Sequence, residues 1–279
     1  MFFIANHPIY NHPLPEGHRF PMLKYELLPK QLLHEGTAEC TDFYSPDSID
    51  LSLVHAVHTV SYVKALTELT LDAKAVRSIG FPLSAALVER ELRIAQGTVV
   101  GCNHALEHGI AFNIAGGTHH AFSDRGEAFC LLNDQAIAAQ YLINQKKCHK
   151  ILIVDLDVHQ GNGTAEIFQN NADVITFSMH GQSNYPFRKE TSDYDIALPD
   201  KTDDTTYLSI LQETLPELLN IHRPDFVFYL AGVDILGTDK LGKLGCTLEG
   251  CKTRDSYVLG LCKSLGIPVQ VSMGGGYSP

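Results

Sequence analysis

The sequence predicts a single α/β domain in which a parallel sheet is covered by helices on both faces. Short apolar runs rich in β-branched residues, typical of buried strands, alternate with longer segments of helical spacing. No linker rich in Pro, Gly or Ser divides the 279 residues, and their number suffices for one large core. Strands that alternate with helices in this way favour a parallel sheet.

Six strands and four helices are predicted along the chain. The strands are expected at 2–5, 110–114, 151–155, 174–178, 226–231 and 268–272. The helices are expected at 84–107, 133–145, 205–221 and 250–265. Ligands of open parallel sheets bind outside the carboxyl ends of the strands, so the polar residues after each strand are the candidate site.

The composition is that of a folded globular protein and excludes several classes. Hydrophobic residues make up 44% and charged residues 19%, which argues against disorder. The formal net charge of −11 repels phosphate backbones, so we expect no direct nucleic-acid partner. A cationic substrate, such as a lysine-rich peptide or a polyamine, would be tolerated or attracted.

The cysteines and the apolar runs indicate the cellular setting. Seven scattered cysteines contain no Cys-x-x-Cys pair, which predicts neither a disulfide framework nor a thiolate zinc site. No stretch approaches the roughly 20 apolar residues of a membrane span, and the amino-terminal apolar run is too short for a signal peptide. We therefore expect a cytoplasmic protein without a membrane span, and the oligomeric state stays open.

Polar residues at the end of the strand 151–155 indicate a metal site. Asp155, Asp157 and His159 alternate with apolar residues, which places all three side chains on one side of an extended strand. Buried unpaired charge is costly, and a cation would be the common partner. Carboxylate with imidazole and without thiolate suits zinc, with manganese or iron as alternatives. The competing interpretation is a hydrogen-bonded strand end at the start of a helix.

Asp234 adds a carboxylate after the strand 226–231. A metal held by Asp157, His159 and Asp234 would keep a position open for water, as catalytic sites do. A lone aspartate after a strand is most often a helix cap, so Asp234 alone is weak evidence for a metal site. It supports the site only as a third ligand beside Asp157 and His159.

Two adjacent histidines, His119 and His120, follow a Gly-Gly turn after the strand 110–114. In a loop both rings can face a cleft and form an acid/base pair, each with an acceptor for its Nδ1–H. Asp155 can serve one ring and Asn162 the other. The alternative is a pair of surface histidines.

The last predicted strand leads into Gly274-Gly275-Gly276 and Tyr277. Glycines let the backbone approach a ligand closely, and the tyrosine hydroxyl could donate to a developing oxyanion. Glycine-rich strand ends also bind phosphate, but neither Gly-Lys-Ser nor Gly-x-Gly-x-x-Gly opens a helix here.

Together these motifs resemble the histone deacetylase superfamily. The order is Gly-Gly-Thr-His-His, Asp-Leu-Asp-Val-His-Gln-Gly-Asn-Gly, Ala-Gly-Val-Asp and Gly-Gly-Gly-Tyr, and the resemblance runs from Gly17 to Tyr277. Asn162 resembles the class IV branch and its bacterial relatives, because classes I and II usually have aspartate there. The resemblance implies the arginase/deacetylase fold with an eight-stranded parallel sheet. It also implies one catalytic domain over 1–279, truncated or disordered after Tyr277, where the family continues with another helix.

The same resemblance implies roles for the residues of the metal site. Asp157, His159 and Asp234 would be the zinc ligands. His120 would be the general base, oriented by Asn162. His119, paired with Asp155, would assist electrostatically and in protonating the leaving amine.

The resemblance also implies a substrate pocket and a second ion. Tyr277 would polarise the acyl carbonyl, and Arg19 resembles an arginine of an internal channel for the released acid. Ser178 and Met179 match a structural potassium site. The residues expected against the substrate, the first two as aromatic walls of a tunnel, are Phe129, Tyr185, Gly275, Gly276 and Arg19.

The function that the resemblance implies is zinc-dependent hydrolysis of an acylated amine. The substrate would be acyl-lysine in a protein, an acetylpolyamine or another acylated small amine, with acetyl or a longer fatty acyl group. An arginase-type ureohydrolase is one alternative, but it uses two manganese ions and extra aspartates where this chain has Gln160 and Asn162. A catalytically weak or silent acyl-lysine binding module is the other, and it would predict loss of a ligand, a histidine or the tyrosine.

Overall fold

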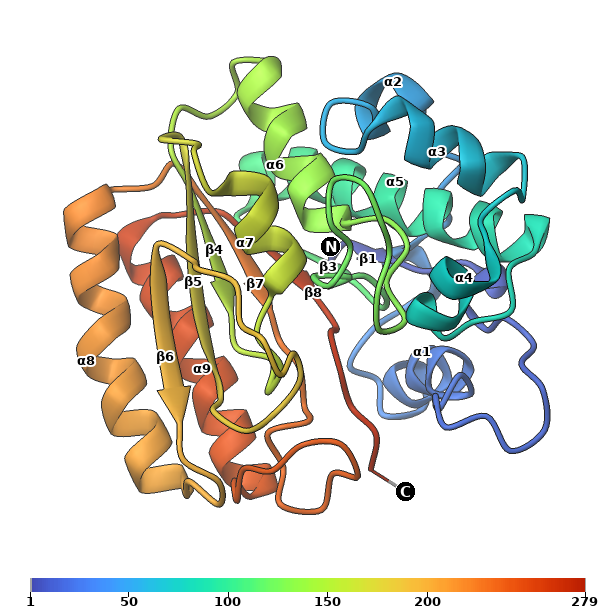
Figure 1. Ribbon diagram of the computed structural model, residues 1–279. Helices are drawn as coiled ribbons and strands as arrows, with labels where there is room; N and C mark the ends of the chain where they lie inside the picture. Colours follow the sequence, from blue (N-terminus) through green and yellow to red (C-terminus); the bar gives the residue numbers. More distant parts are fainter. Residues whose placement is uncertain (1, 279) are drawn as a thin grey trace.

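Eight parallel strands form the centre of the computed structural model, which describes residues 2–278 (Figure 1). The strand order is β2-β1-β3-β8-β7-β4-β5-β6, and every neighbouring pair is parallel. The eight-stranded parallel sheet implied by the resemblance is therefore confirmed. The strands are β1 (Ile4–Ala5), β2 (Phe43–Tyr44), β3 (Ile110–Asn113), β4 (Ile151–Asp155), β5 (Val174–Gly181), β6 (Tyr194–Leu198), β7 (Phe226–Leu230) and β8 (Val269–Ser272).

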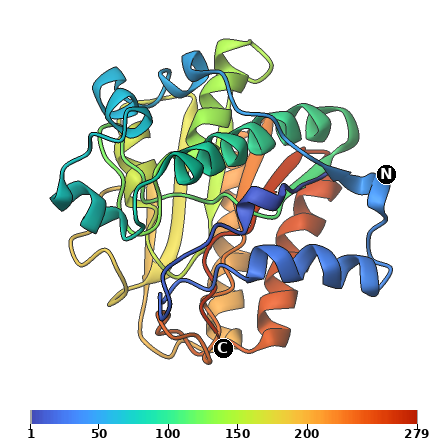
Figure 2. The same cartoon turned by 90° about the vertical axis from the view of Figure 1, so that its right-hand side faces the viewer.

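Helices cover both faces of the sheet. The long helix α5 (Ala85–His108) lies across one face together with α6 (Asp134–Asn144), and Figure 2 views α5 in front of the strands. Helices α8 (Asp204–His222) and α9 (Leu248–Leu265) lie side by side on the other face (Figure 1). The remaining helices are α1 (Lys24–His34), α2 (Leu51–Val54), α3 (Val60–Thr67), α4 (Ala73–Ile79) and α7 (Asn162–Phe168).

The central strand β4 shows why both faces need cover. Ile151 and Ile153 point into the apolar cluster that contains the buried residues of α5 and α6. Leu152 and Val154 point the other way, into the cluster of α8 and α9. Full burial of such a side chain contributes about 1.5–3 kcal/mol, so apolar residues are favoured at every position of a strand whose two faces are both buried. The sequence of such a strand is therefore a continuous apolar run rather than an alternating one.

The predicted helices are confirmed to within two residues at each end, because their caps are local. The Ser84 side chain accepts a hydrogen bond from the Leu87 backbone N–H at 3.2 Å and begins α5. Asn133 caps α6 in the same way through the Ala136 N–H at 3.0 Å. Gly109, at φ +91°, ends α5 in the left-handed conformation that glycine tolerates.

Two strands and five short helices are absent from the six-strand, four-helix prediction. Strands β2 and β6 lie at the two edges of the sheet and are buried on one side at most, so neither is a continuous apolar run. Strand β5 continues past the predicted end at 178, through His180 to Gly181. Its last residues are buried although His180 is polar, because the His180 ring and the Ser178 hydroxyl are hydrogen-bond partners of each other.

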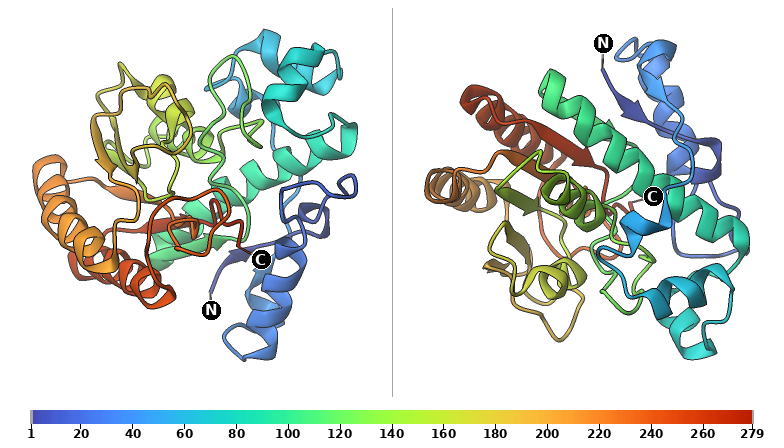
Figure 3. Two further views of the ribbon diagram at one scale, coloured as in Figure 1. Left: turned by 60° about the horizontal axis from the view of Figure 1, so that its bottom comes forward. Right: turned by 90° about the horizontal axis from the view of Figure 1, so that it is seen from above.

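Parallel pairing brings the carboxyl ends of all strands to one edge of the sheet, which the left view of Figure 3 turns toward the reader. The loops that follow β3, β4, β7 and β8 meet there. Arg254 of α9 is fully buried beneath two of them and donates hydrogen bonds to the carbonyls of Leu156 at 3.2 Å, Gly232 at 2.6 Å and Ala231 at 3.3 Å. One guanidinium therefore ties the chain after β4 to the chain after β7.

His58 ties down the long loop after β3. The buried ring is 2.9 Å from the Phe122 carbonyl through Nδ1, and its Nε2 accepts from the Asn133 backbone N–H at 2.9 Å. These partners require a neutral ring that donates from Nδ1. Burial lowers the pKa of His58 to about 4.

The buried His58 predicts an acid-sensitive stability. Its pKa is lower in the folded state, about 4, than the ordinary value of 6.5 expected when unfolded, so protons bind the unfolded chain preferentially. The contribution is complete above about pH 6.5 and is lost as the pH falls toward about 4. On going from about pH 7.5 to about pH 4.5, the wild type should lose about 2–3 kcal/mol more unfolding free energy than His58→Gln in urea titrations. Equal losses would contradict this assignment.

Removal of the Arg254 guanidinium should destabilise the fold. Arg254→Met leaves three buried carbonyls without donors, which predicts a loss of about 3 kcal/mol or more in urea unfolding. Lys252→Met is the matched control, because Lys252 is exposed on the same helix, and it should change stability by about 0.5 kcal/mol or less. A similar effect of both substitutions would show that the carbonyl contacts contribute little.

Candidate metal centre and active site

Asp157, His159 and Asp234 converge at the carboxyl edge of the sheet. Their ligand atoms all lie within 4.8 Å of one another, and all three residues are buried. The His159 Nδ1 is 3.0 Å from Asp157 Oδ1 and 3.2 Å from Asp234 Oδ2. Asp157 and His159 lie in the loop after β4, and Asp234 lies after the neighbouring strand β7, as parallel pairing requires.

Backbone donors hold the outer oxygen of each carboxylate, and the inner Oδ1 of Asp157 also accepts from the His159 backbone N–H at 2.9 Å. The Gly275 N–H donates to Asp157 Oδ2 at 2.7 Å, and the Val158 N–H donates to Asp234 Oδ1 at 3.0 Å. The other oxygen of Asp234, Oδ2, is buried and has no hydrogen-bond partner among the described residues. A buried carboxylate oxygen without a donor is costly, and a cation would remove that cost.

The electrostatics of the three side chains also fit a cation. Burial and the neighbouring Asp157 charge raise the pKa of Asp234 to about 6. Although burial alone would lower it, the hydrogen bond with Asp157 and the negative charges of Asp157 and Asp234 raise the pKa of His159 to about 10. These shifts show how strongly the crowded carboxylates favour a nearby positive charge. Two carboxylates and an imidazole without thiolate form a donor set that suits zinc.

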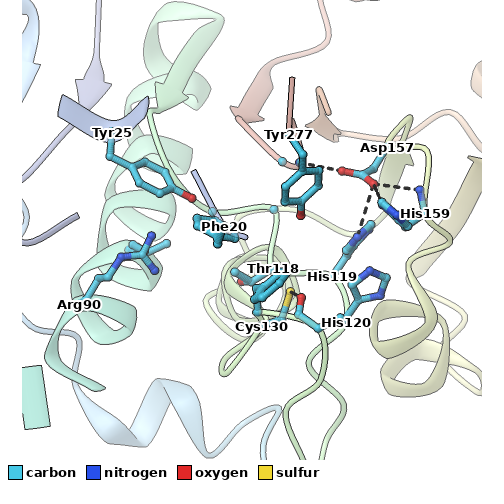
Figure 4. Close-up of a pocket in the computed structure, with 17 residues that line it drawn as sticks. Phe20, Tyr25, Arg90, Thr118, His119, His120, Cys130, Asp157, His159 and Tyr277 are labelled. Atoms are coloured by element: carbon cyan, nitrogen blue, oxygen red, sulfur yellow. Dashed lines mark hydrogen bonds and ion pairs between the residues drawn. The ribbon is translucent and has the colours of Figure 1, made fainter. Parts of the chain in front are cut away.

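His119 and His120 face the same site, with ring centroids 4.1 Å apart (Figure 4). The Nδ1 of His119 is 2.6 Å from Asp155 Oδ2, and the Nδ1 of His120 is 2.6 Å from Asn162 Oδ1. Because both acceptors take the Nδ1 proton, both Nε2 atoms are directed toward the centre of the site. Asp155 is thus a partner of His119, separate from the three converging ligands.

The two histidines differ in charge because their partners differ. Burial and the charges of His119 and His159 hold the pKa of His120 well below its usual range, so its ring is neutral. Burial also opposes a charge on His119, but the Asp155 carboxylate outweighs it and raises the pKa of that ring. Adjacent groups whose environments drive their pKa values apart are a hallmark of acid/base pairs.

The glycine-rich segment after β8 lies against the converging carboxylates. A Cβ on Gly275 would come within 2.7 Å of Asp157 Oδ2 and would also collide with Asp234, so only glycine fits. Gly275 thus lines the site through its backbone, whereas the carbonyl of Gly276 lies 3.5 Å from the Lys24 ammonium. The sequence predicts substrate contact for both glycines, and the structure places only Gly275 among the cavity-lining residues it describes.

Tyr277 reaches back over the site from this segment. Its ring centroid is 6.3 Å from that of His159, and Figure 4 shows its hydroxyl directed into the pocket. The Tyr277 backbone N–H donates to Asp239 Oδ2 at 2.6 Å, which fixes the segment. Burial and the nearby Asp157 charge hold the pKa of Tyr277 well above its usual range, so the hydroxyl keeps its proton and can donate it in a hydrogen bond.

An inner cavity of ≈ 40 Å³ lies beside the histidines and extends toward α5. Arg90 and Asp157 are among its lining residues, and the buried Arg90 lies with its guanidinium carbon 4.8 Å from the Tyr25 ring centroid (Figure 4). The expectation that Arg19 belongs to an internal channel is wrong, because Arg19 is exposed and lies over the Phe129 ring at 5.0 Å. Helical position could have identified Arg90, since it shares the buried face of α5 with Leu87 and Ile94.

An outer pocket is lined by His120 and His159, which also line the inner cavity. Phe129 lines both as well. The Tyr185 ring stands edge-on to His120 with centroids 5.0 Å apart, and its hydroxyl donates to Glu127 Oε2 at 2.6 Å. The two aromatic walls predicted from the sequence therefore both lie at the site.

Ser178 lies beside the metal loop, because it pairs with Asp155 in the register of β5 and β4. Its hydroxyl is 3.0 Å from His180 Nδ1. Met179 is fully buried in the core on the side of α8 and α9. The potassium site expected at Ser178 and Met179 stays a prediction.

Comparisons with known proteins agree on one family. The family model described as histone deacetylase domain matches residues 18–279. An uncharacterized protein of Picosynechococcus sp. is 48% identical over 277 residues, which cover 99% of this chain and 92% of that protein. Histone deacetylase 2 of Arabidopsis thaliana is 28% identical over 271 residues, which cover 93% of this chain and 70% of that protein.

A solved structure shares the fold. The crystal structure of an HDAC homolog complexed with SAHA superimposes with a TM-score of 0.86 at 23% identity, covering 99% of this chain and 79% of that one. Within residues 2–278, the structure contains no helix long and apolar enough to cross a membrane. The matched domain, spanning nearly the whole sequence, supports an activity of the deacetylase type, and the chain belongs to the histone deacetylase family.

Proposed function

We propose that this chain, over residues 1–279, is a zinc-dependent deacylase that hydrolyses the amide of acyl-lysine or a related acylated amine. The observation that carries the proposal is the convergence of the buried ligand atoms of Asp157, His159 and Asp234 within 4.8 Å of one another. Zinc held by these three side chains would supply Lewis-acid polarisation of the acyl carbonyl and an attacking water of lowered pKa. Family membership supports the deacetylase class but leaves the acyl group open.

The two histidines divide the proton transfers between them. Neutral His120 is ready to take a proton from the attacking water, because Asn162 occupies its Nδ1 and leaves Nε2 free. His119, held by Asp155, carries positive charge more readily, which stabilises the negative charge that develops on the carbonyl oxygen. The leaving amine then takes its proton from this pair.

Tyr277 and the aromatic walls position the acyl carbonyl. The protonated Tyr277 hydroxyl can donate to the developing oxyanion, and such a donor is worth roughly 10²–10³ in rate. Phe129 and Tyr185 would enclose the alkyl chain of the amine and exclude water from the site.

Three finer assignments belong to the same proposal. We place the chain in the class IV-like branch, because Asn162 stands where other classes usually have aspartate and its amide binds His120. Ser178 and Met179 would contribute to a structural potassium site next to Asp155. All seven cysteines are free thiols, which fits a reducing cytoplasm.

The alternative functions find less support in the geometry. A ureohydrolase would need further carboxylates for a second ion, but Gln160 is committed to Glu190 and Asp195, and Asn162 to His120. A silent binding module would be expected to have lost a metal ligand, a histidine or the tyrosine. This chain retains the three ligands, both histidines and Tyr277, and all of them lie at one site.

Zinc should bind tightly and stabilise the protein. We expect about one zinc per chain by metal analysis, a rise in Tm on adding zinc to chelated protein, and loss of deacylation with chelator. Asp234→Asn should lose the zinc-dependent rise in Tm, whereas Asp173→Asn, an exposed carboxylate at the opposite edge, should keep it. A wild type without bound divalent metal would overturn the proposal, and turnover that persists with chelator would do the same.

Asn162→Asp should change the pH profile in a defined direction. A carboxylate in place of the amide adds negative charge 2.6 Å from His120 Nδ1 and favours the protonated ring, so the pKa of the base rises. The acidic limb of kcat/KM should move to higher pH, and the rate on the plateau should rise by roughly tenfold. An acidic limb at the wild-type position would count against His120 as the base.

A further inference from the structure

The outer pocket carries positive charge although the chain as a whole is acidic. Its volume is ≈ 450 Å³, within the range of small-molecule sites. Arg19 and Lys243 are the charged aliphatic side chains that line it, and no carboxylate is among its described lining residues. The formal net charge of −11 therefore misrepresents the surface that a substrate meets first.

Both cations are held in place without a direct carboxylate partner, and the Ser183 hydroxyl that Lys243 contacts donates in turn to Asp200. The Arg19 guanidinium lies over the Phe129 ring, with 5.0 Å from its carbon to the ring centroid. The Lys243 ammonium donates to the carbonyl of Ser183 at 3.0 Å and to its hydroxyl at 3.2 Å. Within residues 2–278, neither Arg19 nor Lys243 forms an ion pair with a carboxylate.

Carboxylates in the adjoining loops are already engaged. Glu127 accepts from the Tyr185 hydroxyl and pairs with Arg125 at 2.9 Å. Asp239 accepts from the backbone N–H groups of Leu241 and Gly242, both at 2.8 Å, besides that of Tyr277. These bonds orient both carboxylates toward partners inside the protein, so neither lines the outer pocket, whose wall carries Arg19 and Lys243.

The outer pocket is placed to receive the amine portion of a substrate. It shares His120, His159 and Tyr277 with the inner cavity at the metal site, and Phe129 also lines both. An acyl-amine whose carbonyl lies at His120 and Tyr277 would extend its amine portion past Phe129 toward Arg19 and Lys243. The exposed Phe187, whose ring lies edge-on to Tyr185 at 6.4 Å, adds an apolar edge to the same wall.

We propose that Arg19 and Lys243 select acylated amines whose amine portion carries a carboxylate, such as an acylated amino acid with a free α-carboxylate. This inference rests on the proposed deacylase function and specifies its substrate class. It reverses the expectation from net charge, because polyamines and lysine-rich peptides would bring like charges together in the outer pocket. Partly exposed ion pairs of this kind are each modest and are weakened by salt.

The test uses one pair of compounds that differ only in charge. Nα-capped, Nε-acylated lysine with a free α-carboxylate is compared with its α-carboxamide on the zinc-loaded protein. We expect kcat/KM to favour the carboxylate by about tenfold at low salt, with the preference shrinking at about 0.5 M NaCl. Carboxamide-ended acyl-lysine peptides with Asp or Lys neighbours show whether the anion can come from a peptide, and an acetylpolyamine should be the poorest substrate.

Substitutions of Arg19 and Lys243 test whether these two residues cause the preference for the carboxylate. The ratio of kcat/KM for the two compounds should fall toward one in Arg19→Gln with Lys243→Gln, and Arg19→Lys should retain most of it. Lys263→Gln is the matched control, because Lys263 is exposed on α9 at the opposite edge of the sheet, and it should leave the ratio at the wild-type value. A wild-type ratio of one, or a ratio that survives the double substitution, would overturn the inference while leaving deacylation intact.

A binding measurement separates this inference from the proposed function. Calorimetric titration of the same two compounds gives a ratio of Kd values that does not depend on turnover. A preference for the carboxylate in binding without hydrolysis of either compound would support the selection and reject the deacylase. Equal Kd values for the two compounds would reject the selection.

Discussion

The structure depends on the burial of negative charge at one edge of the sheet. Asp155, Asp157 and Asp234 are each at most 3% exposed and lie at the ends of two neighbouring strands. Carboxylates are rarely buried unless they are paired, so the protein must provide positive charge or donors for each of them. His119 serves Asp155, and backbone N–H groups serve the outer oxygens of the other two. The ligand atoms of Asp157, His159 and Asp234 converge on the space between them, and this set of two carboxylates and an imidazole suits zinc.

The surrounding elements keep this arrangement rigid. Arg254 holds the chain after β4 against the chain after β7 from below, and His58 fixes the loop that carries the histidine pair at two points, Phe122 and Asn133. Neither residue touches the site itself. A reactive edge made of loops can therefore keep its geometry, because each loop is tied to a buried polar side chain that belongs to the scaffold.

Much of this could be predicted from the sequence, and the omissions have physical reasons. Continuous apolar runs identify the central strands because both of their faces are buried, whereas the edge strands β2 and β6 lack that signature. The positions of Asp157, His159 and Asp234 follow from parallel pairing alone. The sequence does not tell which arginine, Arg19 or Arg90, lines the inner cavity, since this depends on how a distant helix packs. The sign of the charge in the outer pocket likewise depends on how six loops from distant parts of the sequence meet, which no local pattern encodes.

The hydrogen bond from Gly275 to Asp157 links the last strand of the chain to the metal ligands. The segment that carries Tyr277 is therefore bonded to the same carboxylate that would bind the ion. By thermodynamic reciprocity, any ion that favours one orientation of Asp157 also favours one placement of this segment, and the ordered segment favours the ion by the same free energy. Binding of the metal and placement of Tyr277 would then stabilise each other, so the two catalytic elements would become ordered together.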